Sequence, residues 1–164
     1  ESIHPFEDGN GRIGRALSEK VLSQYLERPT LIALSHIIEN NKKLYYKSLH
    51  LNSKEIEITS WLEYFCETIL QAQDYTQRMI DFLIGKTKYF QKFDKGFNDR
   101  QRKVVNRIFR EGIEGFKGGL SADNYIKITG TTASTATRDL KKMVDLGALR
   151  KTGERKGTRY YLSL

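Results

Sequence analysis

The stretch that decides the fold of the N-terminal part is a glycine-bearing loop that runs directly into a helix: His4-Pro5-Phe6-Glu7-Asp8-Gly9-Asn10-Gly11-Arg12-Ile13-Gly14-Arg15. After the glycines, apolar residues recur at every fourth position, at Ile13, Leu17, Val21 and Tyr25, which predicts an amphipathic helix packed along that side. Two glycines around an asparagine allow successive backbone N–H groups to point the same way. They stand at a helix N-terminus, where unpaired amides and the helix dipole attract an anion. The stretch therefore predicts an anion-binding loop.

The side chains of this loop complete the parts of a phosphate-transfer site. Arg12 and Arg15 share a helix face, and two guanidinium groups beside such a loop suit a polyphosphate. Asp8 is a hard oxygen ligand of the kind that holds the Mg²⁺ accompanying phosphates. His4 stands where it can take a proton from an incoming hydroxyl. The alternative is that the glycines only shape a turn and Asp8 only caps the helix. The full set favours phosphoryl or nucleotidyl transfer.

These residues resemble a known family signature. Every fixed position of the Fic signature, HxFx(D/E)GNGRxxR, is filled here, by His4, Phe6, Asp8, Gly9, Asn10, Gly11, Arg12 and Arg15. The resemblance extends over roughly residues 1–90 with declining specificity. It implies an all-helical domain that transfers AMP from ATP to a Ser, Thr or Tyr hydroxyl of a target protein. Some members of the family instead remove AMP or transfer other phosphate-containing groups.

The resemblance also implies a role for each residue of the signature, with ATP and Mg²⁺ as cofactors. His4 would be the catalytic base that deprotonates the target hydroxyl, and Asp8 would hold Mg²⁺. Phe6 would anchor the loop in the core. The remaining residues would bind the phosphates: Gly9, Asn10 and Gly11 as the cradle, Arg12 near the β-phosphate and Arg15 at the γ-phosphate.

Two further expectations follow from the family pattern. Fic proteins have helices and a β-hairpin flap before the signature, whereas three residues precede His4 here, so we expect a fragment with weak or absent transferase activity. Residues 35–40 also match the inhibitory pattern (S/T)xxxE(G/N) of many Fic proteins. The favoured interpretation is nevertheless an ordinary core-lining helix with a solvated Glu39.

Helix signals continue as far as residue 93. We expect a helix from Leu31 to Leu51, a third that begins at Thr59 or Ser60 and runs through Ile69, and another over residues 78–93. No apolar run approaches the ~20 residues that span a bilayer, and no signal peptide opens the chain. The single cysteine, Cys66, excludes an internal disulfide and fits a reducing compartment. We therefore expect a cytoplasmic protein without a membrane partner, with Cys66 in the core.

The positive charge is concentrated in the C-terminal part. The chain has a net charge of +8, with 13 Lys/Arg and 13 Asp/Glu in residues 1–97 but 15 and 7 in residues 98–164. This asymmetry predicts two domains, the C-terminal part of a Fic domain at 1–95 and a second domain at 96–164. The predicted fold is mainly α, a partial Fic helical domain followed by a small α/β winged-helix domain.

The second domain is predicted as helix, short helix, helix and two-stranded ribbon, an order that resembles a winged helix-turn-helix. The helices begin near residues 98, 121 and 131, and the strands lie near 148–152 and 158–162. In such modules the third helix enters the major groove of duplex DNA and the ribbon contacts its backbone. The candidate nucleic-acid-binding residues are Thr132, Thr135, Arg138, Lys142, Arg155 and Lys156.

Two readings of the whole chain follow. The favoured one is a Fic-type protein adenylyltransferase whose winged helix selects targets or binds DNA. The alternative is a DNA-binding regulator whose Fic part is sensory or inactive. The second domain could instead serve for protein contacts or for dimerisation, with its charges solvated. Dimerisation would make the protein a homo-oligomer. The intact signature favours the enzyme.

Overall fold

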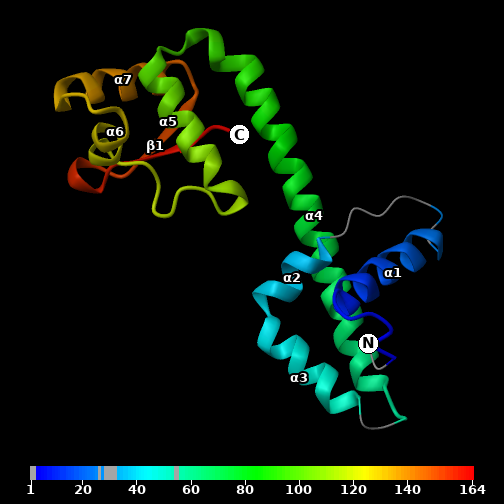
Figure 1. Cartoon of the computed structure of the whole chain (residues 1–164). Coiled ribbons are helices and arrows are strands. Elements are labelled where there is room, and N and C mark those ends of the chain that lie inside the picture. The colour runs from blue at the N-terminus through cyan, green and yellow to red at the C-terminus, as the bar shows by residue number, and fades with distance from the viewer. Residues whose placement is uncertain (1–2, 26, 28–32, 54–55) are drawn as a thin grey trace. The chain divides into compact units, whose positions relative to one another are not determined.

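The computed structural model describes residues 3–25, 27, 33–53 and 56–164. Within those residues the chain is mainly helical, as predicted, with seven α-helices and one two-stranded antiparallel sheet (Figure 1). The elements are α1 (Asn10–Tyr25), α2 (Leu34–Asn40), α3 (Lys42–Asn52), α4 (Thr59–Phe93), α5 (Asp99–Arg110), α6 (Ala122–Thr129), α7 (Ala133–Asp145), β1 (Leu149–Thr152) and β2 (Arg159–Leu162).

The chain forms two compact units, Glu1–Arg78 and Met79–Leu164. The division falls within α4, a single helix of 35 residues where two separate helices were predicted. That prediction was wrong because the connecting residues, 70–77, contain neither glycine nor proline and continue the helix without a break. The predicted domains, 1–95 and 96–164, stay a prediction. None of the described helices combines the length and apolar character that crossing a membrane requires.

In the first unit, α2 and α3 pack against the N-terminal half of α4 (Figure 1). A single helix was predicted from residue 31 to 51, of which residues 31 and 32 lie outside the described part. The structure instead breaks the helix at Asn41, whose side-chain amide donates to the carbonyl of Ile37 at 3.3 Å and so competes with the helical backbone. The buried core of this unit consists of Leu34, Ile37, Ile38, Tyr45 and Ala72.

Three predictions about this core are wrong. The apolar side of α1 is open: Leu17 is 56% exposed and Val21 62% exposed, and Phe6, expected to anchor the loop, is 52% exposed. No described element covers these side chains, because the first unit gathers its buried residues on α2, α3 and α4. Cys66, expected in the core, is exposed on α4.

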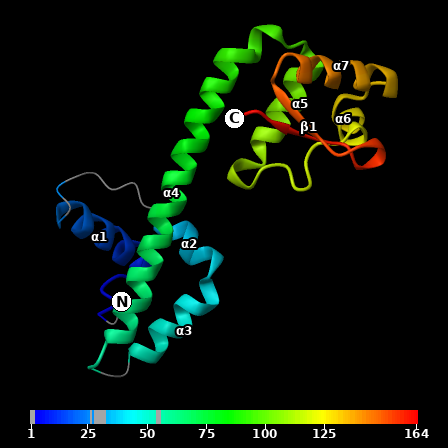
Figure 2. The same cartoon turned by 180° about the vertical axis from the view of Figure 1, so that it is seen from behind.

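In the second unit, each helix begins at the residue type that caps it. Asn98 accepts from the backbone N–H of Gln101 and forms a capping box. Ser121 caps α6 by accepting from the backbone N–H of Asn124, and Thr132 caps α7 by accepting from that of Thr135. After α7 the chain forms the ribbon, in which β1 pairs with β2 and Arg150 stands opposite Tyr161. Figure 2 shows the same helices and β1 from behind. The predicted starts of α5, α6 and α7 and the two predicted strands are therefore confirmed to within two residues.

A buried carboxylate ties α5, α6 and α7 of the second unit together. Asp139 of α7 is 4% exposed and accepts hydrogen bonds from Arg100 Nε at 2.8 Å, Tyr125 Oη at 3.0 Å and Asn98 Nδ2 at 3.2 Å. Burial alone works to raise the pKa of Asp139, but the hydrogen bonds from Arg100, Tyr125 and Asn98 outweigh it and leave this pKa below its usual value. The carboxylate therefore remains charged and holds α5, α6 and α7 in register.

Candidate functional site

The loop before α1 is held in shape by one asparagine. Asn10 is buried, and its side chain accepts from the backbone N–H of Phe6 at 3.1 Å and donates to the Phe6 carbonyl at 2.6 Å. Gly9 has φ of +85°, a conformation that glycine adopts without strain. The helix starts there, since Ile13 N–H donates to the Gly9 carbonyl at 2.9 Å. The first-turn amides of α1 have no partner within the helix and stay free to bind a ligand.

A cavity of about 340 Å³ lies over this helix end. Its lining brings together every residue that the sequence assigned to phosphate, metal or base: His4, Asp8, Gly9, Asn10, Gly11, Arg12 and Arg15, with Glu7 and Tyr46 added. Of these, Asn10 uses its side chain to hold the loop, so what it offers a ligand is its backbone amide. The roles of these residues remain predictions, but their gathering around one space is a feature of the structure.

Asp8 and Arg12 contact each other at the rim of the cavity. Arg12 Nη2 lies 2.9 Å from Asp8 Oδ2, and the other oxygen of Asp8 accepts from the Gly9 backbone at 2.6 Å. Both side chains are largely exposed, and an ion pair of this kind contributes little to stability. The two groups can therefore separate at little cost and bind a cation and an anion respectively.

Arg15 lies deeper in the site and is incompletely satisfied. Its Nε is buried and has no hydrogen-bond partner among the described residues. A buried donor without an acceptor is costly, and in native proteins it often marks a place where a ligand or water binds. Because Arg15 also lines the cavity at the helix N-terminus, an anion in the cavity is the natural acceptor.

Tyr46 is the residue of the cavity that sequence reasoning did not assign. Tyr46 belongs to α3, and it is 52% exposed whereas the neighbouring Tyr45 is buried. The two rings contact each other edge to face, with centroids 5.3 Å apart. The tyrosine pair was a visible signal in the sequence. Its use could not be inferred because the approach of α3 to the loop is a long-range contact.

The donor set of the cavity fits a metal held jointly with a ligand. Among the described residues there is no cluster of three or more His, Cys, Asp or Glu side chains able to hold a metal ion by themselves. Asp8 is a single exposed carboxylate beside an anion-binding helix end. That arrangement suits Mg²⁺, which is usually bound by one or two carboxylates together with phosphate oxygens and water.

The segment that matches the inhibitory pattern has an ordinary structural explanation. Glu39 is exposed and pairs with Lys42 at 3.2 Å, while Ile37 and Ile38 of the same helix are buried in the core. Glu39 is also absent from the lining of the cavity that contains Arg15. The expectation of a solvated Glu39 on a core-lining helix is confirmed.

Of the six candidate nucleic-acid-binding residues, four belong to α7 or its N-cap and two to the ribbon turn. Thr132 caps α7 and hydrogen-bonds with Thr135, and Arg138 and Lys142 are exposed further along the same helix. Arg155 and Lys156 lie in the ribbon turn, where they line a cavity of about 660 Å³. The cavity is also lined by seven residues that were not candidates: Ser121, Ala122, Asp123, Thr137, Thr158, Arg159 and Tyr160.

Comparison with known protein families matches residues 1–22 to the Fic/DOC family. The matched stretch contains the whole loop and most of α1, and therefore every residue that lines the first cavity except Tyr46. The similarity is local and covers 22 of the 164 residues.

Proposed function

We propose that the chain carries the active site of a Fic-type nucleotidyltransferase, which transfers AMP from ATP to a hydroxyl of a target protein. The observation that carries the proposal is the cavity that Arg15 lines together with His4, Asp8 and the N-terminus of α1, since the buried Nε of Arg15 has no partner among the described residues. The family match over the same residues supports it. In this proposal the triphosphate of ATP supplies the acceptor that Arg15 lacks.

The phosphates are bound by the first turn of α1 and by two guanidinium groups. The amides around Gly9 and Gly11 and the helix dipole favour negative charge. Arg12 leaves Asp8 for the β-phosphate region, and Arg15 binds the terminal phosphate through charge-assisted hydrogen bonds. In the proposal these contacts neutralise the charge that the leaving pyrophosphate develops.

His4 is the proposed base. It lines the cavity and has φ of +45°, an uncommon conformation for a residue with a side chain. Residues in such conformations concentrate at functional sites, where the surrounding structure holds them. In the proposed step the imidazole accepts the proton of the target hydroxyl. The hydroxyl oxygen bonds to the α-phosphorus as the bond between that phosphorus and pyrophosphate breaks. Asp8 would hold Mg²⁺, which supplies charge neutralisation at the phosphates.

The test is transfer of label from ATP. The chain is incubated with cell extract and ATP labelled either on the α- or on the γ-phosphate, and protein-bound label is measured. Because we expect this chain to be at most weakly active, the proposal predicts a low level of incorporation, of the α-label only, and its loss in His4→Ala. Substitution of His50, a histidine of α3 outside the cavity lining, by Ala is the matched control and should leave incorporation unchanged. Incorporation of the γ-label, or incorporation that survives in His4→Ala, would contradict the proposal.

A second function, binding of duplex DNA by the second unit, is favoured by its charge. By the composition of the sequence the unit Met79–Leu164 carries +10 and the unit Glu1–Arg78 carries −2. The order α5, α6, α7 and ribbon resembles that of a winged helix, and the cavity at Arg155 and Lys156 is also lined by Thr137 of α7. Here DNA binding would select where the transferase acts.

If this unit binds DNA, affinity must fall steeply with salt, because phosphate contacts release counterions. We expect the logarithm of the association constant to fall linearly with the logarithm of salt concentration. Double substitution of Arg155 and Lys156 by Gln should reduce the slope by about two. Binding that does not change with salt, or the absence of binding to any duplex, would contradict this second function.

A further inference from the structure

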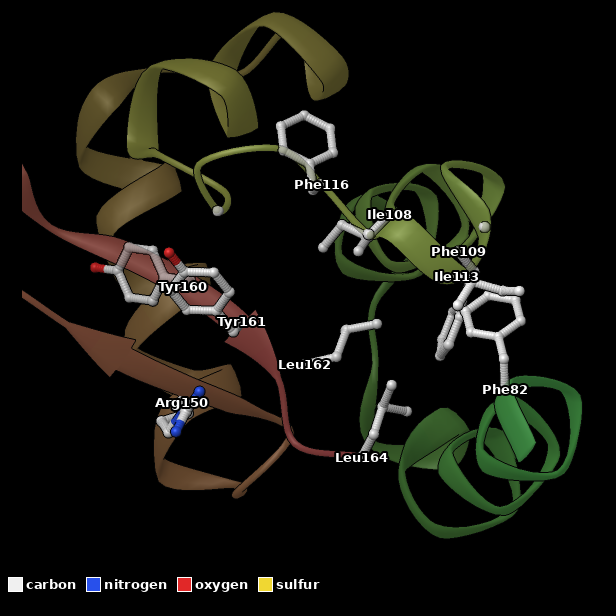
Figure 3. A pocket seen from close by; sticks show the side chains of 13 residues that line it. Phe82, Ile108, Phe109, Ile113, Phe116, Arg150, Tyr160, Tyr161, Leu162 and Leu164 are labelled. Carbon is white, nitrogen blue, oxygen red and sulfur yellow. The ribbon is translucent and has the colours of Figure 1, made fainter. Parts of the chain in front are cut away.

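A further cavity, distinct from the candidate active site and from the cavity at Arg155 and Lys156, lies inside the unit Met79–Leu164 (Figure 3). It has a volume of about 270 Å³ and a mostly apolar wall. Phe82, Phe109 and Ile113 line one side, and Tyr161 and Leu162 of β2 face them across the space (Figure 3). Small-molecule sites typically combine such an apolar, largely preformed cavity with a few polar groups.

The chain leaves this space open through its glycines. The turn between α5 and α6 forms part of the wall, and it presents Gly112 and Gly115 to the cavity. A Cβ atom at either position would meet no other atom within 4 Å, so no neighbouring group fills the space beside them. Behind the turn, Ile108 and Phe109 are buried and give the cavity a fixed floor. The cavity is therefore bounded by the packed core on one side and by the glycine backbone of the turn on another.

One charged side chain lines this apolar wall. Arg150 of β1 lines the cavity, and its guanidinium carbon lies 5.9 Å from the ring centroid of Tyr161, its cross-strand neighbour. Other arginines of this unit, Arg100 and Arg102, pair with carboxylates. No acidic partner of Arg150 occurs anywhere in the described chain. A cation beside an apolar cavity, with its pairing capacity unused, is complementary to an apolar molecule that carries one negative charge.

We propose that this cavity binds a small carboxylic acid with an aromatic or aliphatic body, its carboxylate on Arg150 and its apolar part between Phe109, Ile113 and Leu162. The size supports this class of ligand. An engineered apolar cavity of about 150 Å³ accommodates benzene, so the larger volume here accommodates a ring with a short acidic side chain. The ligand gains from burial of its apolar surface and from a charge-assisted pair with the guanidinium.

The test uses 3-phenylpropionate and its uncharged analogue 3-phenylpropionamide as probes, titrated into the ¹⁵N-labelled chain and followed by amide chemical shifts. We expect saturable shifts confined to residues 108–120 and 159–164, and about tenfold tighter binding of the acid than of the amide, as one charge-assisted pair supplies. Arg150→Gln should bring the two affinities within about twofold of each other. Lys151→Gln, a neighbour on the same strand outside the cavity lining, should keep the preference.

Three outcomes would overturn the proposal. Absence of saturable shifts with 3-phenylpropionate would show that the space takes no ligand of this class. Equal affinity for the acid and the amide, or a preference that survives in Arg150→Gln, would show that Arg150 has no part in binding. Shifts of the same amides on raising the protein concentration without probe would assign the space to a second copy of the chain. Ile113→Trp, which fills the cavity, should abolish binding of both probes while far-ultraviolet circular dichroism stays unchanged.

Discussion

At the residue scale, Asp139 is the side chain on which the packing of the second unit depends most clearly. It accepts from three donors on two other segments, and Gln101 donates to its backbone carbonyl at 3.1 Å. Replacement of the carboxylate leaves Tyr125 and Asn98 with a weaker acceptor and Arg100 with no counter-charge. The loss is moderated because the Arg100 side chain is 41% exposed and partly solvated.

We therefore expect Asp139→Asn to lower the free energy of unfolding of this unit by about 2 kcal/mol. Urea denaturation followed by circular dichroism measures it. Asp145→Asn, an exposed position at the end of the same helix, is the matched control and should change stability by less than about 0.5 kcal/mol. Equal effects of the two substitutions would show that the Asp139 hydrogen bonds do not stabilise the unit.

The same carboxylate predicts a pH dependence. Its pKa in the folded chain lies below its ordinary value, so the folded state binds this proton less readily than the unfolded state does. Its contribution is therefore complete above the unfolded pKa, about pH 4, and is lost as pH falls through the folded pKa. The stability difference between wild type and Asp139→Asn should accordingly be constant near neutral pH and shrink below about pH 4. A difference that grows on acidification would reverse the assigned sign.

At the element scale, two backbone segments approach each other closely in the turn of the ribbon, at Gly153 and Gly157. Gly153 has φ of +70°, and a Cβ atom there would lie 2.5 Å from the carbonyl oxygen of Gly157. Gly130, the C-cap of α6, has the same φ of +70° but no atom within 4 Å of the added Cβ. The two positions therefore share the conformational cost of an alanine and differ in the steric one.

We expect Gly130→Ala to destabilise the chain by about 1 kcal/mol, the cost of a left-handed conformation for a residue with a side chain. Gly153→Ala should cost at least about 1 kcal/mol more, because the ribbon must shift to relieve the contact. Thermal unfolding of the two variants against wild type measures the difference. Equal destabilisation would mean that the turn opens freely at Gly153.

Elements set by local chemistry were predictable from the sequence, and those set by distant contacts were not. Asn98, Ser121 and Thr132 mark helix starts because a side-chain oxygen caps the nearest amides, which needs no knowledge of the fold. The loop of the candidate site was predictable for the same reason. The contribution of Tyr46 to that site, and the burial of Asp139, depend on partners far away in the sequence. The helix break at Asn41 had a local cause, but asparagine within a helix gives an ambiguous signal.

At the scale of the whole molecule, the two units have cores of unequal size. The buried cluster of the second unit contains 14 residues and that of the first contains 5, counted over the described residues. The first unit also leaves the apolar side of α1 exposed. Because buried apolar area supplies most of the stabilisation, the first unit should be the less stable of the two.

We predict that the units unfold in separate steps. Trp61 is the single tryptophan of the chain and packs against the core of the first unit, so its fluorescence reports that unit. Its transition in urea should come at a lower concentration than the transition in far-ultraviolet circular dichroism that reflects the second unit. Asp139→Asn should move the second transition and leave the first in place. Coincident transitions by both probes would instead indicate one cooperative molecule.

Binding of ATP in the cavity over the N-terminus of α1 can be measured directly by isothermal titration calorimetry in the presence of Mg²⁺. The proteins to compare are wild type, Arg15→Gln and Arg78→Gln. Arg78 is an exposed arginine of α4 outside the cavity lining and serves as the control. The account predicts saturable binding to wild type, a loss of at least about tenfold in Arg15→Gln, and no change in Arg78→Gln. Equal affinity of wild type and Arg15→Gln, or no binding at all, would contradict it.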